Sequence, residues 1–71
     1  MKKDWSDTSS TVLWTDYNEL TNHVAVNFVG NKKYHYFHVP KEVYEELLAA
    51  DSVGKFLNTR IKNVYDYARI S

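Results

Sequence analysis

The sequence has no cysteine, one proline and two glycines among 71 residues. Without cysteine, neither a disulfide nor a cysteine-ligated zinc ion can hold the fold together. The low proline and glycine content, with 44% hydrophobic residues, argues against extended disorder. No apolar stretch approaches the roughly 20 residues of a membrane-spanning helix, and "MKKDWSDTSS" lacks the apolar segment of a signal peptide. We therefore expect a soluble, cytoplasmic protein that does not associate with membranes.

Charge gives no general attraction to nucleic acid, because nine basic residues balance nine acidic ones. The distribution along the chain is less even. Residues 52–65 contain Lys55, Arg60 and Lys62 and no acidic residue. These three positive charges form either a local cationic patch or an ordinary solvated helix face.

The first half of the chain is typical of antiparallel strands. Residues 1–8 are polar apart from Trp5 and are predicted to form a flexible amino-terminal arm. Three later segments combine β-branched and aromatic residues with turn residues between them, which predicts strands at residues 10–17, 23–29 and 33–39. Gly30 and Asn31 predict a tight hairpin turn, and consecutive strands with short connections form a meander.

The second half is typical of two helices. Pro40 suits the start of a helix, and residues 41–50 are mostly good helix formers. Asp51 or Ser52 can cap a second helix, whose apolar residues recur at helical spacing. The predicted fold class is α+β: a three-stranded antiparallel β-meander followed by two short helices packed on one sheet face. We place the folded domain at residues 9–67 and a carboxy-terminal tail at residues 68–71.

No pattern of catalytic or metal-binding residues is present in the sequence. His35 and His38 are three apart on a predicted strand, so their side chains point to opposite faces and cannot readily share one ion. No acidic residue near His23 completes a zinc set. The serines lack a nucleophile elbow, and no phosphate-binding glycine loop is present. We expect a non-enzymatic protein without a metal or cofactor.

The aromatic strand "KKYHYFHVP" leaves two interpretations open. A period of two places Tyr34, Tyr36 and His38 on one face and His35, Phe37 and Val39 on the other. In the first interpretation, the tyrosine face packs under the helices and Phe37 lies on the other side. In the second, the tyrosines are exposed and stack on nucleic-acid bases, an interaction of about 1–3 kcal/mol per base.

The order of several short motifs resembles the KTSC domain, a family found at the carboxy terminus of some lysyl-tRNA synthetases and as free-standing bacterial or phage proteins. The resemblance covers about residues 9–67 and fits a free-standing member. It rests on a serine pair, Tyr17, a central Tyr-x-Tyr, a Val-Pro before a helix, and the segments "VNF", "VYEELLAADSVGKFLNTRI" and "YDY". Asn18 departs from the usual aspartate, and the hairpin glycine stands one position early, at Gly30; both are loop positions.

The resemblance implies RNA binding as the leading function. On the matching positions, Tyr34 and Tyr36 are the aromatic partners, and Asn58, Arg60 and Lys62 meet phosphates. Convergence of positive charge on the tyrosine face would favour this function. The residues that would supply this positive charge are Lys32, Lys33, Lys55, Arg60 and Lys62.

The alternative is a protein-interaction module of phage or prophage type that binds and inhibits a host protein. Trp5, Trp14 and Phe37 are the candidate anchors if they are exposed, because aromatic residues dominate binding hot spots. An apolar patch rimmed by mixed charge would favour this alternative. An open sheet edge or face would also allow a homodimer.

Overall fold

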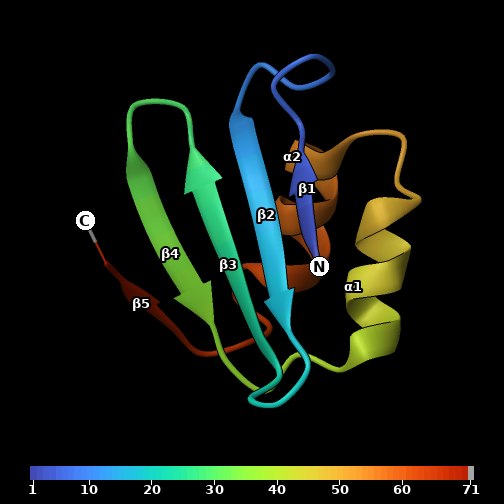
Figure 1. Ribbon diagram of the computed structural model, residues 1–71, viewed down its shortest axis with the longest axis vertical. Helices are drawn as coiled ribbons and strands as arrows, with labels where there is room; N and C mark the ends of the chain where they lie inside the picture. Colours follow the sequence, from blue (N-terminus) through green and yellow to red (C-terminus); the bar gives the residue numbers. More distant parts are fainter. Residues whose placement is uncertain (71) are drawn as a thin grey trace.

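A five-stranded antiparallel sheet forms one layer of the structure, which is a computed structural model that describes residues 1–70 (Figure 1). The strands are neighbours in chain order: β1 (Lys2–Asp4), β2 (Val12–Asn18), β3 (His23–Phe28), β4 (Lys32–Tyr36) and β5 (Tyr67–Arg69). The predicted central meander is confirmed, whereas the predicted strand count of three is wrong. The two additional strands come from the expected arm and from the carboxy-terminal end. Ser71, the last residue of the expected tail, lies outside the described residues.

The two additional strands lie at the sheet edges and carry little sequence signal. β1 is Lys-Lys-Asp, fully exposed, and it pairs with β2 through its backbone. The adjacent Trp5 anchors it, since this side chain is buried and its Nε1 donates to Thr15 Oγ1 at 2.9 Å. β5 pairs with β4, and Ile70 N extends this pairing by donating to Lys33 O at 2.7 Å. Short edge strands of this kind are held by backbone pairing and not by an apolar face.

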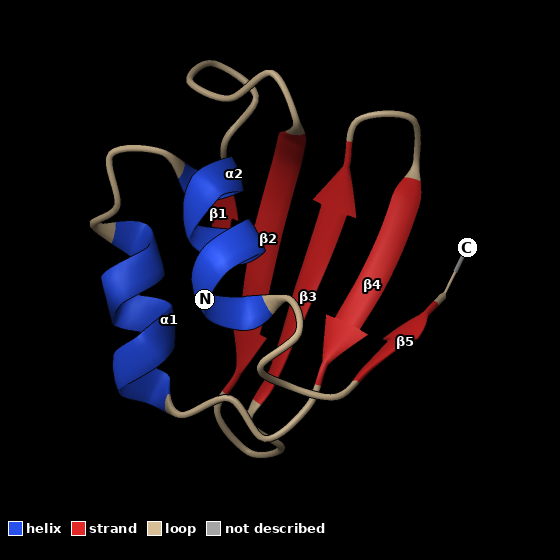
Figure 2. Ribbon diagram, turned by 180° about the vertical axis from the view of Figure 1, so that it is seen from behind, coloured by secondary structure: helices blue, strands red, loops and turns tan. Residues whose placement is uncertain are grey.

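The second layer consists of helices on one face of the sheet, which confirms the α+β fold class (Figure 2). α1 (Lys41–Leu48) follows Pro40, and α2 (Val53–Phe56) continues directly into a π-helical turn, η1 (Leu57–Ile61). Of the two residues predicted as caps of the second helix, Asp51 and Ser52, the structure uses Ser52, whose Oγ accepts from Lys55 N at 3.3 Å. The wider turn is marked by a bond between residues five apart, in which Lys62 N donates to Leu57 O at 2.7 Å.

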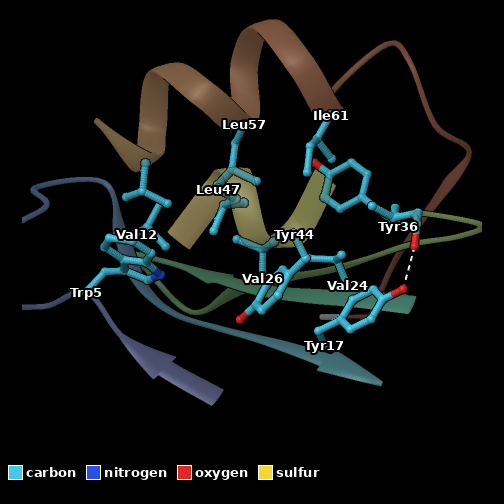
Figure 3. Close-up of a cluster of buried hydrophobic side chains, with 12 residues drawn as sticks. Trp5, Val12, Tyr17, Val24, Val26, Tyr36, Tyr44, Leu47, Leu57 and Ile61 are labelled. Carbon is cyan, nitrogen blue, oxygen red and sulfur yellow. Dashed lines mark hydrogen bonds between the residues drawn. The ribbon is translucent and has the colours of Figure 1, made fainter. Parts of the chain in front are cut away.

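The core lies between the sheet and the helices (Figure 3). Tyr17 on β2 and Tyr44 on α1 stack at 5.1 Å between ring centroids. The Tyr17 hydroxyl donates to Val39 O at 2.7 Å, and the Tyr44 hydroxyl donates to Met1 O at 2.9 Å. The remaining buried apolar residues are Trp5, Val12, Val24, Val26, Tyr36, Val39, Leu47, Val53, Leu57 and Ile61.

The chain leaves the sheet earlier than the alternation predicts. β4 ends at Tyr36, and His38 takes a left-handed backbone conformation with φ 57°. This turn brings Val39 back into the core, where it is fully buried and its N donates to Asn22 O at 2.9 Å. The predicted grouping of Val39 with His35 on the opposite face is therefore wrong, because strand periodicity stops at the turn.

The helices do not cover the whole face of the sheet. They lie over the side of β1 and β2, and β4 and β5 extend beyond them (Figure 2). Tyr17, Val24, Tyr36 and Tyr67 face one another across four adjacent strands, so their side chains share the helix-facing side. The exposed fraction of these side chains is 3% or less through Tyr36 and rises to 57% at Tyr67. The uncovered end of the sheet leaves room for a cleft.

Candidate ligand-binding site

An open cleft of about 1170 Å³ lies between the uncovered end of the sheet and the second helical segment. One wall is formed by β3, β4 and β5, and the other by α2 and η1. The loop before β2, at residues 8–11, closes part of the rim. The cleft therefore forms where the helical layer stops short of the sheet edge.

Three tyrosines form the aromatic floor of this cleft, and we refer to Tyr34, Tyr36 and Tyr67 as the tyrosine cluster. Their ring centroids are 6.3 Å apart for Tyr34 and Tyr36, 5.7 Å for Tyr34 and Tyr67, and 5.9 Å for Tyr36 and Tyr67. Phe28 meets Tyr34 edge-on at 5.6 Å. Tyr36 is buried, Tyr34 is half-buried and Tyr67 is exposed. The burial expected by the first interpretation of the aromatic strand therefore fits Tyr36, and the exposure expected by the second fits Tyr34 in part.

The buried Tyr36 carries no phenolate charge at neutral pH. Burial raises the pKa of Tyr36 above its ordinary value, and the neighbouring Tyr34 and Tyr67 raise it further. A phenol normally ionises near pH 10, so a raised pKa keeps it neutral over a wide range. A neutral Tyr36 does not repel an anionic ligand.

The lysines of the cleft have no acidic partners among the residues that the structure describes. Lys32, Lys55 and Lys62 line the cleft, and none of them forms an ion pair within residues 1–70. Elsewhere, Lys41 Nζ lies 2.8 Å from a Glu19 carboxylate oxygen. The sole acid among the lining residues is Asp51 at the rim. The cleft therefore carries a local excess of positive charge although the whole chain is neutral.

Comparison with family models shows to which protein family this chain is related. The model of the KTSC domain matches residues 8–65, which is most of the chain. The chain belongs to the KTSC domain family. The resemblance noted in the sequence is therefore confirmed.

Two further comparisons agree with this membership. A protein of Tsukamurella paurometabola is 39% identical over 54 residues, which cover 76% of this chain and 81% of that protein; it bears no functional name. The crystal structure of a KTSC domain protein from Yersinia pestis has a TM-score of 0.91 and covers 100% of this chain and 97% of that chain. At 22% sequence identity, this structure is similar in fold.

In this KTSC domain, most of the residues predicted to bind nucleic acid come together. Six of the eight predicted residues line the cleft: Lys32, Tyr34, Tyr36, Lys55, Asn58 and Lys62. Lys33 lies across from Asn27 on the other face of the sheet. Arg60 is outside the cleft, where it pairs with Glu46 at 3.3 Å and covers the ring of Phe56 at 5.2 Å.

The residues predicted as protein anchors are dispersed. Trp5 is 6% exposed and belongs to the core, so it offers no surface anchor. Trp14 lies on the face of the sheet opposite the helices, with Lys2 Nζ 4.6 Å from its ring centroid. It borders a shallow groove of about 300 Å³. Phe37 packs edge-on against His23 at 4.8 Å.

The cleft residues that were not candidates from the sequence include Tyr67, Ser10 and Asn63. Tyr67 belongs to the closing "YDY" and Ser10 to the serine pair, so both stood within motifs of the family resemblance. Asn63 belongs to no motif of the resemblance. Its left-handed backbone conformation (φ 68°) is seen in the folded chain and not in the sequence.

The described part of the chain contains neither a candidate metal site nor a helix that could span a membrane. Residues 1–70 hold no group of three histidine, cysteine, aspartate or glutamate side chains that could bind a metal ion. Within the same residues, every helix is too short to cross a membrane.

Proposed function

We propose that this KTSC domain is a non-enzymatic module that binds single-stranded RNA in the cleft. The observation that carries the proposal is one cleft lined by the tyrosine cluster and by three lysines without acidic partners. Single-stranded RNA combines flat bases with a chain of phosphates, and proteins bind it through aromatic rings and cations. The cleft offers both groups on one surface, which fits a cytoplasmic RNA ligand.

The exposure of the side chains that line the cleft indicates which of them could bind bases and which could bind phosphates. Tyr34 and Tyr67 present accessible ring surface for base stacking, and the buried Tyr36 supports both rings from the sheet. Stacking contributes about 1–3 kcal/mol per base. Lys32 on the sheet wall and Lys55 and Lys62 on the helical wall are available for phosphates, because no internal acid holds them.

The proposal of a non-enzymatic role rests on the residue types in the cleft. The lining residues include no histidine and no glutamate, and the sole acid is Asp51 at the rim. His35 lies on the opposite face, in register with Ala25 and Ala68. A serine nucleophile needs an adjacent base such as histidine, and the serines of the cleft have no histidine among the lining residues.

The test is fluorescence anisotropy with a labelled single-stranded RNA over a salt series from roughly 50 to 200 mM. Lys55→Ala and Lys62→Ala should each weaken binding and lower the salt slope by about one. Arg60→Ala is the matched control, since this side chain is on the same helical segment but pairs with Glu46. Absence of binding at low salt would overturn the proposal.

A second candidate function is binding and inhibition of a host protein through the uncovered sheet face. The observation in its favour is the groove beside Trp14, on a face that no helix covers (Figure 1). A purified partner that binds the wild type and not Trp14→Ala would support it. Self-association through this face would appear as a concentration-dependent mass in sedimentation, and Trp14→Ala should abolish it.

A further inference from the structure

We infer that the cleft reads the ribose 2′-hydroxyl of a segment of about two or three nucleotides, so that it prefers RNA over DNA. This inference deepens the proposed function and rests on it. The tyrosine cluster accounts for the bases and the three lysines for the phosphates. Polar side chains of the cleft that make no hydrogen bond within the fold remain to meet the sugar.

Several polar side chains of the rim are already engaged in holding the fold. Ser9 Oγ accepts from Thr11 N at 3.2 Å and from Val12 N at 3.0 Å, which fixes the loop that enters β2. Thr11 Oγ1 lies 3.3 Å from Ser9 Oγ. Ser52 Oγ caps α2. These hydroxyls lose a structural bond if they turn to a ligand.

Three other polar side chains are not engaged. Ser10, Asn58 and Asn63 line the cleft, are exposed, and make no side-chain hydrogen bond within residues 1–70. They come from three segments: the loop before β2, η1, and the turn after η1. A hydroxyl and two amides together supply donors and acceptors. The 2′-hydroxyl of ribose is itself both a donor and an acceptor, and deoxyribose lacks it.

The size of the site follows from the cluster and the volume. Tyr34 and Tyr67 are the two accessible rings, and the cleft measures about 1170 Å³. Sheet-based RNA-binding domains place about two or three bases on a comparable set of aromatic side chains. The ligand is either a segment of a longer strand or a free short oligonucleotide, because both present the same chemistry.

The experiment compares oligo(U) with oligo(dU), each about ten nucleotides long, because these differ at the 2′ position alone. We expect the wild type to bind oligo(U) about five- to tenfold more tightly, as one or two hydrogen bonds would give. Ser10→Ala, Asn58→Ala and Asn63→Ala should lower the affinity for oligo(U) toward that for oligo(dU), and leave oligo(dU) binding unchanged. Thr59→Ala is the control, since Thr59 Oγ1 donates to Lys55 O at 2.8 Å and does not line the cleft.

The outcomes separate the two proposals. Equal affinity for oligo(U) and oligo(dU) overturns the ribose inference and leaves nucleic-acid binding intact. Binding of neither probe overturns the proposed function itself. Competition by free uridine trinucleotide supports the short site, whereas competition by longer strands alone overturns the inferred size. Thermal melting of each variant verifies that it is folded.

Discussion

The helix-facing side of the sheet has two halves that use the same residue type differently. On the covered half, Tyr17 and Tyr44 stack on each other, and both hydroxyls are hydrogen-bonded to backbone carbonyls. On the uncovered half, the hydroxyls of Tyr34 and Tyr67 make no hydrogen bond within residues 1–70. A tyrosine under the helices is thus committed to the fold, whereas one beyond them keeps its ring and hydroxyl available to a ligand.

Charge repeats this contrast. Outside the cleft, Lys41 and Arg60 each meet a glutamate. Inside it, the lysines meet no acid, so their charge is available to a ligand. A net charge of zero therefore does not exclude a cationic site, because the cleft lining holds three lysines and one acid while Glu19 and Glu46 pair with cations elsewhere.

The largest expected effect is a stability difference between the two halves. Tyr44→Ala removes a fully buried ring and should lower the free energy of unfolding by about 3–5 kcal/mol, the usual cost of truncating a buried aromatic side chain. Tyr67→Ala, in the exposed half, should cost less than about 1 kcal/mol. Urea unfolding of both variants measures this difference. Similar losses would show that the cleft tyrosine is structural.

Alkaline pH should destabilise the fold through its two buried phenols with raised pKa values. Burial raises the pKa values of Tyr36 and Tyr44, whereas the unfolded phenols ionise near pH 10. Above that pH the unfolded state binds fewer protons than the folded state, so stability should fall as pH rises through the unfolded pKa toward the folded one. Melting temperatures measured between roughly pH 8 and 11 should show a flat region and then a decline.

The variant that tests this alkaline decline is Tyr36→Phe. The Tyr36 hydroxyl makes no hydrogen bond within residues 1–70, so its removal should leave stability near neutral pH almost unchanged and reduce the decline. Tyr44→Phe should also reduce the decline, but at a cost at neutral pH, because it breaks the bond to Met1 O. An unchanged decline in both variants would contradict the assignment of the decline to the Tyr36 and Tyr44 phenols.

A smaller effect is expected at Asn27 on β3. This side chain is 5% exposed, and its Oδ1 is buried without a hydrogen-bond partner. An unsatisfied buried acceptor costs about 1–3 kcal/mol, so Asn27→Leu should raise the free energy of unfolding by about 1 kcal/mol. Thr15→Val is the matched control, because it removes a hydroxyl that bonds Trp5 and Tyr44 and should destabilise. A loss of stability in Asn27→Leu would contradict the prediction.

The smallest expected effect concerns the ion pair between Arg60 and Glu46. Both side chains are about half exposed, at 51% and 52%. Exposed pairs contribute about 0.2–1 kcal/mol, so Glu46→Gln should change unfolding stability by that amount or less. RNA affinity should rise slightly or stay constant, since the change frees a cation outside the cleft. A marked gain in RNA affinity would place the freed Arg60 in the binding surface.

Part of the cleft could be predicted because its residues follow regular periods. Tyr34 and Tyr36 are two apart on a strand, so they share a face. Lys55 and Asn58 are three apart on the helical segment, which places them on one side, and Lys62 follows directly after η1. Arg60 falls between these positions and lies outside the cleft. Charge alone could not separate it from Lys62, since both are cations in the same acid-free stretch.

The sequence by itself determined the order of the central strands and the two helical segments. Alternating apolar residues, the Gly30–Asn31 turn and the Ser52 cap act over a few residues, and each leaves a local pattern. The tertiary structure alone decided the two edge strands, the return of Val39 to the core, and the meeting of Tyr67 with Tyr34. Those features depend on backbone pairing and on where the helical layer ends, and both join residues far apart in the chain without a periodic signature.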